Sequence, residues 1–351
     1  MKIAPMIDAI HEEQKRGTKI DFRLVHTGQH YDKNMSGSFF EQLGIPQPDE
    51  NLGAGGGTQA EQTAAIMTGY EKLLMDQPSD LCIVVGDVTS TMACAITAQK
   101  MHIPVAHVEG GIRSGDWKMP EEINRLATDA VTNWFFTTSQ VANENLLKSG
   151  VEKERIFYVG NTMIDTLLKH QPRFRKPSVW DEIGLQEKEY MVMTLHRPAN
   201  VDEEQALKGL MDEIIANTKD LPLVFPVHPR TAKMLNKIGI RHERLHMIEP
   251  LGYLEFNYLV ERSKAVITDS GGITEETTVM GIPCMTLRDS TERPETITIG
   301  TNELLGTDPK AIKPAMDTLF AGNWKTGDIP ELWDGKTSER IVRHVTELLQ
   351  G

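Results

Sequence analysis

The chain has 351 residues, a net charge of −13, 39% hydrophobic and 25% charged residues, an ordinary composition for a globular protein long enough for two domains. The acidic balance disfavours broad binding to nucleic acid or to an anionic membrane surface, and no apolar run reaches membrane-spanning length. We therefore expect no nucleic-acid and no membrane partner. The three cysteines lack metal-ligand spacing, which favours buried thiols in a reducing compartment and no bound metal.

The first half of the chain alternates between predicted helices and strands. Apolar residues at helical spacing predict helices at 3–13, 59–75, 92–101, 120–131 and 142–149. Short apolar runs predict strands at 21–26, 81–85, 105–108, 134–137 and 156–159. Such alternation is typical of an α/β fold with a parallel sheet, which binds ligands at the carboxyl ends of its strands.

The same alternation restarts after a basic segment with two prolines. Strands are predicted at 190–195, 223–226, 245–248, 265–268 and 283–287, and helices at 202–217, 232–237, 254–262 and 338–349. We expect a first domain at 1–168, a linker at 169–178, a second domain at 179–335 and a final segment, 336–351, whose helix packs back on the first domain. The sequence thus predicts two similar α/β domains facing a cleft.

A glycine turn in the second half follows the predicted strand 265–268. Ser270, Gly271 and Gly272 lead from this strand into a helix that carries Glu276 one turn later. Glycine lets the backbone approach a ligand closely, and the N–H groups at a helix start attract an anion. The Glu276 carboxylate suits ribose hydroxyls better than a phosphate. The segment predicts a nucleotide diphosphate site, although a Ser-capped turn without a ligand is an equal alternative for the motif alone.

Other polar side chains lie at or soon after the predicted strand ends. They are Asp87, Glu109, Arg113, His196, His228 and Arg293, and Glu121 opens a nearby helix together with Glu122. Each has a structural alternative, such as a helix cap for Asp87, a helix-dipole partner for Glu121 or a surface ion pair for Arg293. Their recurrence at successive strand ends favours function, and three acids with a histidine suit proton transfer. No Gly-x-Gly-x-x-Gly motif follows a first strand, so we expect no nicotinamide or other cofactor.

An ordered series of motifs resembles the non-hydrolysing UDP-N-acetylglucosamine 2-epimerases. The motifs are Thr27-Gly28-Gln29-His30, Gly86-Asp87, His107-Val108-Glu109-Gly110-Gly111, Pro120-Glu121-Glu122, Gly160-Asn161-Thr162, His196-Arg197-Pro198, Asp269-Ser270-Gly271-Gly272 and Thr291-Glu292-Arg293-Pro294-Glu295. The match runs from Lys2 to about Asp308. The resemblance implies two Rossmann-like domains of glycosyltransferase-B type, a cytoplasmic homodimer, and interconversion of UDP-GlcNAc with UDP-ManNAc for cell-surface polysaccharides.

The resemblance also implies residue roles. In the family, a base removes the C2 proton while UDP leaves C1, and UDP then adds back to a 2-acetamidoglucal as C2 is protonated on the other face. By similarity, Asp87, Glu109 and Glu121 are the acid/base candidates and His196 is a catalytic or phosphate-stabilising partner. The remaining candidates bind the substrate or an allosteric UDP-sugar. Substrate binding is implied for Lys2, Arg113, His228, Phe256 (uracil), Ser270, Gly271, Gly272, Glu276 (ribose) and Arg293, and an allosteric role for Gln29 and His30.

One departure from the family concerns the start of the sequence. The family opens with a strand and a Gly-Thr-Arg-Pro loop, whereas Lys2-Ile3-Ala4-Pro5 matches the helix that follows them. The resemblance therefore predicts that the first domain lacks its central first strand, which would expose the neighbouring strands. Alternatives to the epimerase are a sister epimerase for a modified UDP-sugar, a hydrolysing relative, a glycosyltransferase of the same fold, and an inactive UDP-sugar-binding remnant.

Overall fold

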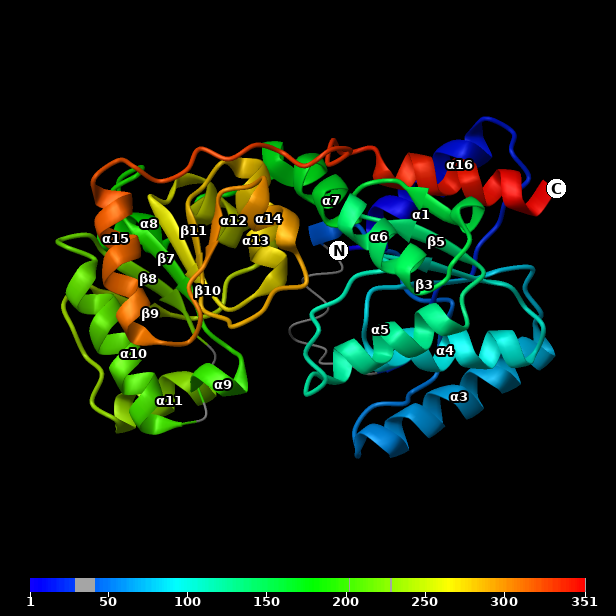
Figure 1. Cartoon of the computed structure of the whole chain (residues 1–351), viewed down its shortest axis with the longest axis horizontal. Helices are drawn as coiled ribbons and strands as arrows, with labels where there is room; N and C mark the ends of the chain where they lie inside the picture. Colours follow the sequence, from blue (N-terminus) through cyan, green and yellow to red (C-terminus); the bar gives the residue numbers. More distant parts are fainter. Residues whose placement is uncertain (29–41, 202, 228, 351) are drawn as a thin grey trace. The chain divides into compact units, whose positions relative to one another are not determined.

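The computed structural model describes residues 1–28, 42–201, 203–227 and 229–350 and divides the chain into two compact units. Unit 1 comprises Met1–Lys169 and Glu331–Gly351, and unit 2 comprises His170–Pro330. Each unit has helices packed around parallel strands, as the sequence predicts (Figure 1). None of the helices in the described ranges is long and apolar enough to cross a membrane.

The main sheet of unit 1 has four parallel strands in chain order. They are β3 (Cys82–Val85), β4 (Val105–Val108), β5 (Trp134–Thr137) and β6 (Ile156–Tyr158). A separate two-stranded parallel sheet contains β1 (Val25–His26) and β2 (Glu50–Asn51). Among the residues that the structure describes, β1 and β3 therefore each pair with a single strand. The strand predicted at 21–26 is shorter than expected because only its last two residues pair with β2.

Helices cover both faces of the four-stranded sheet (Figure 1). On one face α1 (Ala4–Lys15) and α16 (Thr337–Gln350) contact each other, and their apolar side chains pack on β4 and β5. On the other face lie α3 (Gln59–Asp76), α4 (Thr89–Lys100) and α5 (Pro120–Ala130). Helix α3 begins with a capping box, in which Thr58 Oγ1 accepts from the Glu61 N–H and the Thr58 N–H donates to the Glu61 carboxylate. The unit also contains α6 (Gln140–Lys148) and most of α7 (Thr162–His170).

Unit 2 is built on a six-stranded parallel sheet. Its order is β12 (Asn302–Leu304), β11 (Cys284–Thr286), β10 (Ala265–Thr268), β7 (Met191–Thr194), β8 (Leu223–Pro226) and β9 (Leu245–Ile248). Successive side chains of a strand point to opposite faces. In β10, Ile267 joins the core on one face and Val266 the core on the other, so both faces are apolar. Burial on both faces explains why the predicted strands are continuous apolar runs.

The helices of unit 2 divide between the two cores. One core includes side chains from α10 (Glu204–Asn217), α11 (Pro229–Lys237) and α15 (Ile312–Phe320). The other includes side chains from α8 (Val179–Ile183), α12 (Tyr253–Arg262) and α13 (Gly271–Met280). The short helices α9 (Pro198–Val201) and α14 (Pro294–Thr298) precede α10 and β12. The sequence prediction missed several short elements and two longer helices: β2, α7, α8, α9, α14, α15 and β12. In α15 a proline at the third position hides the helical pattern.

Candidate active site

Two predicted acids of unit 1 lie beyond neighbouring strands at one edge of the sheet. Asp87 comes two residues after β3, and Glu109 directly follows β4. Val85 is paired with Val108, so the sheet register aligns these two strand ends. Open α/β sheets bind their ligands at this edge. The fold therefore brings together two residues that are 22 positions apart in the sequence, counted as 109 minus 87.

The Glu109 side chain is buried and paired with a lysine. Its carboxylate is 3% exposed, and Oε2 lies 2.7 Å from the Nζ atom of Lys2. The Glu109 backbone has a φ of +73°, a left-handed conformation that is uncommon outside glycine and is held in place by the surrounding structure. Its N–H donates to the carbonyl of Phe136 on β5 at 2.9 Å. Two predicted site residues therefore form one ion pair.

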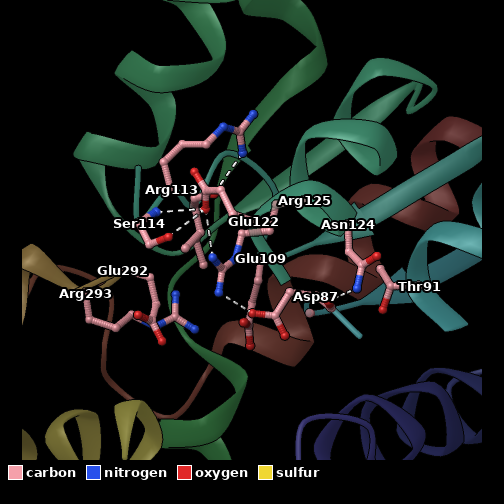
Figure 2. Close-up of polar contacts among 12 residues, drawn as sticks. Asp87, Thr91, Glu109, Arg113, Ser114, Glu122, Asn124, Arg125, Glu292 and Arg293 are labelled. Atoms are coloured by element: carbon pink, nitrogen blue, oxygen red, sulfur yellow. Dashed lines mark hydrogen bonds and ion pairs between the residues drawn. The ribbon is translucent and has the colours of Figure 1, made fainter. Parts of the chain in front are cut away.

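Arg125 links Asp87 to the start of α5. Figure 2 shows this guanidinium between Asp87 and Glu122. Its Nη2 atom forms an ion pair with Asp87, and its Nη1 atom lies 2.9 Å from a Glu122 oxygen. The Asn124 side chain donates to the Asp87 carbonyl at 2.9 Å (Figure 2). Asp87 is therefore held through both its carboxylate and its backbone.

The two adjacent glutamates of α5 have different surroundings. Glu122 is buried and accepts hydrogen bonds from the N–H groups of Ser114 and Gly115, at 2.9 and 3.0 Å, in addition to its contact with Arg125. Burial raises the pKa of Glu122, but these hydrogen bonds outweigh it and lower the pKa below its ordinary value. Glu121 is half-buried, and no hydrogen bond or ion pair of its side chain occurs within the described ranges. Glu122 therefore fixes the loop at Ser114 and Gly115, whereas the Glu121 carboxyl group can still form hydrogen bonds to a ligand.

A buried network supports the backbone on either side of Asp87 and Glu109. The Asp129 carboxylate lies 2.7 Å from His107 Nδ1 and 2.7 Å from Arg113 Nη1. The other ring nitrogen of His107 lies 2.8 Å from the carbonyl oxygen of Gly86. Burial raises the pKa of Asp129, but its contacts with His107 and Arg113 lower it overall. The structure thus places Arg113 in an ion pair behind the two acids.

In unit 2, His196 is oriented by Asp269, which belongs to one of the motifs but is not among the predicted site residues. Its Nδ1 atom lies 2.7 Å from Oδ1 of Asp269, which is fully buried at the end of β10. Asp269 also accepts from the N–H groups of His196 and Arg197 and from the Asn200 amide at 3.1 Å. Burial raises the pKa of Asp269, but these donors lower it overall. The His196 side chain itself is 62% exposed.

The predicted anion site is the start of α13. Ser270 occupies the N-cap position with extended backbone, but its hydroxyl does not cap the helix, and the first turn contains no acid. The Ser270 N–H donates to Thr268 Oγ1 at 3.0 Å. Gly271 and Gly272 are the first two helical residues. A helix start without a side-chain cap retains N–H groups that suit a phosphate.

Glu276, predicted to bind ribose, is buried further along α13. Its Oε1 atom accepts a hydrogen bond of 2.8 Å from the hydroxyl of Tyr253 on α12. Burial raises the pKa of Glu276 to about 7. Phe256, the predicted uracil contact, also lies on α12 and is half-buried against the core. Helices α12 and α13 therefore bring together the residues predicted to bind the nucleoside.

Arg293 is buried and forms an ion pair with Glu275, which is buried as well. Three predicted residues, Gln29, His30 and His228, lie outside the described part of the chain. Within the part that is described, no group of three or more His, Cys, Asp or Glu side chains is placed to hold a metal ion.

Several polar residues of the two sites are absent from the residues selected by sequence reasoning. They are Asn124, Arg125, Asp129, Tyr253, Asp269 and Arg288. Asp269 is detectable in principle because a lone acid follows a wholly apolar strand. The others lie within helices or loops, where spacing gives no sign of a partner far away in the sequence.

One Rossmann-like unit carries acids at its strand ends, and the other carries a helix start that suits a phosphate and a buried acid further along the same helix. Together these features define a nucleotide-sugar enzyme of the glycosyltransferase-B fold class. The chain belongs to the UDP-N-acetylglucosamine 2-epimerase family, which it matches over residues 12–346.

Individual relatives match over nearly the whole chain. The UDP-N-acetylglucosamine 2-epimerase of Methanocaldococcus jannaschii is 38% identical, over 99% of this chain and 95% of that protein. The UDP-2,3-diacetamido-2,3-dideoxy-D-glucuronate 2-epimerase of Pseudomonas aeruginosa is 39% identical, over 93% and 91%. The crystal structure of the M. jannaschii enzyme in complex with UDP-GlcNAc and UDP matches with a TM-score of 0.87, over 99% of this chain and 96% of that chain.

Proposed function

We propose that this protein is an isomerase that interconverts UDP-GlcNAc and UDP-ManNAc without a cofactor. The observation that carries this proposal is the match of both units, over 99% of the chain, to an epimerase crystallised with UDP-GlcNAc and UDP. The reaction inverts C2 of the sugar. A base removes the C2 proton as the bond between C1 and the UDP oxygen breaks, which leaves a double bond between C1 and C2. UDP then adds back to C1, and C2 takes a proton on its opposite face.

Unit 2 holds the UDP part of the substrate in this proposal. The N–H groups at the start of α13 bind the diphosphate, and Phe256 contacts the uracil. The buried carboxyl group of Glu276 binds the ribose hydroxyls. Its high pKa supports this role, because a carboxyl group that is neutral or weakly ionised exchanges hydrogen bonds with hydroxyls but does not repel a nearby phosphate as strongly as a full charge.

Unit 1 supplies the acid/base groups. Asp87 and Glu109 lie at the same sheet edge, each paired with a cation, and Glu121 lies at the start of α5 with no partner among the described side chains. A proton at C2 is only weakly acidic, so several positioned groups favour its transfer. The two faces of C2 require a base and an acid on opposite sides, and we assign these roles to the three carboxylates together.

His196 assists the departure of UDP. Asp269 accepts a hydrogen bond from Nδ1–H, which leaves Nε2 as the ring nitrogen for the substrate. A ring held in this way donates or accepts one proton at a defined atom, which suits a group that meets the developing negative charge on the departing phosphate.

The test is to incubate the protein with UDP-GlcNAc in heavy water and to analyse C2 by NMR and mass spectrometry. Epimerisation places deuterium at C2 of both sugars. A glycosyltransferase leaves C2 protiated, and a hydrolase releases free UDP. UDP-2,3-diacetamido-2,3-dideoxy-D-glucuronate serves as the comparison substrate. Exchange with this sugar and none with UDP-GlcNAc would contradict the proposed substrate, and no reaction with either would contradict the proposed activity.

We also propose that the protein acts as a cytoplasmic homodimer whose UDP-ManNAc enters polysaccharide synthesis. All three cysteines are free and buried, which agrees with a reducing compartment. Light scattering on the purified chain tests the dimer, and a monomeric mass across the working concentration range would contradict it.

A further inference from the structure

The start of α13 lies against two side chains from the segment that follows β11. A Cβ atom placed on Gly271 would lie 2.7 Å from Oε1 of Glu292 and 3.6 Å from Nη1 of Arg288. Both side chains therefore reach the first turn of α13, where the helix N–H groups attract an anion. A side chain at this position would displace the Glu292 carboxylate from where it lies.

Arg288 carries hydrogen-bonding capacity that the described residues do not use. The residue is 5% exposed, and its Nη2 atom donates to Glu292 Oε2 at 2.5 Å. Its Nη1 atom is buried and has no hydrogen-bond partner in the described part of the chain. A buried guanidinium N–H without an acceptor is unfavourable, so it indicates a place for further acceptor oxygens. Arg293, by contrast, is paired with Glu275.

Glu292 also lies near a second guanidinium group. Its Oε1 atom also lies 3.9 Å from Nη2 of Arg197, so one carboxylate faces two guanidinium groups and a helix start. A diphosphate brings more negative charge and more acceptor oxygens than one carboxylate. It satisfies this group of donors better, and Arg–phosphate contacts can be bidentate.

We propose that Glu292 is a displaceable internal anion, whose carboxylate lies where the UDP diphosphate binds and holds Arg288 until the diphosphate takes its place. Arg288 is then a guanidinium that receives the diphosphate. This inference rests on the proposed function and adds a competition within the nucleotide site. Glu292 lies between β11 and α14, outside any helix or strand, so its side chain can turn away without breaking regular structure.

Competition of this kind lowers the apparent affinity for UDP, because only molecules with Glu292 displaced bind it fully. The variant Glu292→Gln has almost the same size and can still accept a hydrogen bond from Arg288, but it lacks the charge. We expect it to bind UDP about threefold to tenfold more tightly than the wild type, which is the gain from removing an occupied competing state. Uridine has no phosphate, so its affinity should stay the same.

Isothermal titration calorimetry with UDP and with uridine tests the inference on the full chain. Arg288→Lys keeps the charge but loses the second guanidinium nitrogen, and we expect it to weaken UDP binding about tenfold and uridine binding hardly at all. Asp289→Asn is the matched control. Its exposed carboxylate bonds to Thr307 at 3.1 Å, so the variant removes one charge from the same loop, and we expect no change in UDP affinity.

An unchanged or weaker UDP affinity in Glu292→Gln overturns the inference, because Glu292 would then only position Arg288. Equal tightening by Asp289→Asn also overturns it, since the effect would be one of net charge. If Arg288→Lys fails to fold, the comparison of UDP with uridine in Glu292→Gln decides alone. A wild type that binds UDP and exchanges deuterium at C2, with no tightening in Glu292→Gln, leaves the proposed function intact. If the wild type neither binds UDP nor exchanges deuterium at C2, both proposals are contradicted.

Discussion

The acids of the two units lie in opposite electrostatic surroundings. In unit 1, Glu109 lies against Lys2 and Asp87 against Arg125, so each carboxylate has a cation beside it. In unit 2, Glu276 is buried with a neutral hydroxyl, that of Tyr253, as its hydrogen-bond partner, and burial raises its pKa to about 7. The same functional group therefore lies beside a cation in one unit and is close to half-protonated near neutral pH in the other.

The different surroundings of these carboxyl groups suit two different functions, proton transfer in unit 1 and hydroxyl recognition in unit 2. Proton transfer needs carboxylates whose charge and direction are set before the substrate binds, and the ion pairs of unit 1 provide both. Recognition of hydroxyl groups next to a diphosphate needs an oxygen with little charge, and burial without a cation provides it. The predictions below test this comparison, beginning with the largest expected effect.

Loss of an acid in unit 1 should have the largest effect on turnover. We expect Asp87→Asn, Glu109→Gln and Glu121→Gln each to lower kcat by about 100-fold to 10,000-fold, the range for losing a general acid or base. Deuterium incorporation at C2 measures the rate. Near-normal exchange in all three variants would show that other groups transfer the proton.

Two further glutamates serve as controls for these variants. Glu144 on α6 is exposed and 3.6 Å from Lys148, so Glu144→Gln should leave both activity and stability unchanged. Glu122→Gln removes a buried carboxylate with several donors and should lower the free energy of unfolding by about 2 kcal/mol. Glu121→Gln should instead leave stability within about 0.5 kcal/mol of the wild type, as for a surface substitution.

Glu276 should make stability depend on pH. Its pKa is raised from 4.5 to about 7 in the folded protein, so the folded state binds the proton more tightly than the unfolded state. This stabilisation is complete below about pH 4.5 and is lost as pH rises through 7, for a total of about 3 kcal/mol. Urea unfolding at pH 4.5 and pH 8 should show a steeper loss of stability in the wild type than in Glu276→Gln. Parallel pH profiles would refute the assigned protonation.

Asp269 should matter for both stability and catalysis. Asp269→Asn keeps the shape but loses the charge that binds His196 and several N–H groups, so we expect a loss of about 2 kcal/mol in the free energy of unfolding. The pH profile of kcat should also change, because the His196 ring loses its fixed tautomer. A variant with lower stability and an unaltered pH profile would limit Asp269 to a structural role.

Apart from the control variants, Tyr253→Phe should have the smallest effect. It removes one hydrogen bond of 2.8 Å to Glu276 and leaves the packing in place. Because that bond lowers the pKa of Glu276, we expect the transition in the pH profile of stability to move upward and the unfolding free energy to fall by about 1 kcal/mol. A transition at the wild-type position would mean that burial alone sets this pKa.

Sequence patterns determined most of the regular structure of this protein. Strands such as β4, β5 and β10 were predicted to the residue, because strands buried on both faces are continuous apolar runs with sharp polar ends. The same polar ends marked Asp87, Glu109, His196 and the Ser270 turn as candidates. The family followed from the order of these motifs along the chain.

Only the tertiary structure decided which charges meet. Arg125 bridges Asp87 and Glu122, and Glu276 bonds to Tyr253. Arg288 lies beside Gly271, and its Nη1 atom has no hydrogen-bond partner among the described residues. Sequence reasoning could not distinguish Glu121 from Glu122 by environment, because adjacent helical residues point about 100° apart and their partners lie elsewhere in the chain. Protonation and hydrogen-bonding capacity depend on burial and on neighbours within a few ångströms, which is information that the order of residues does not contain.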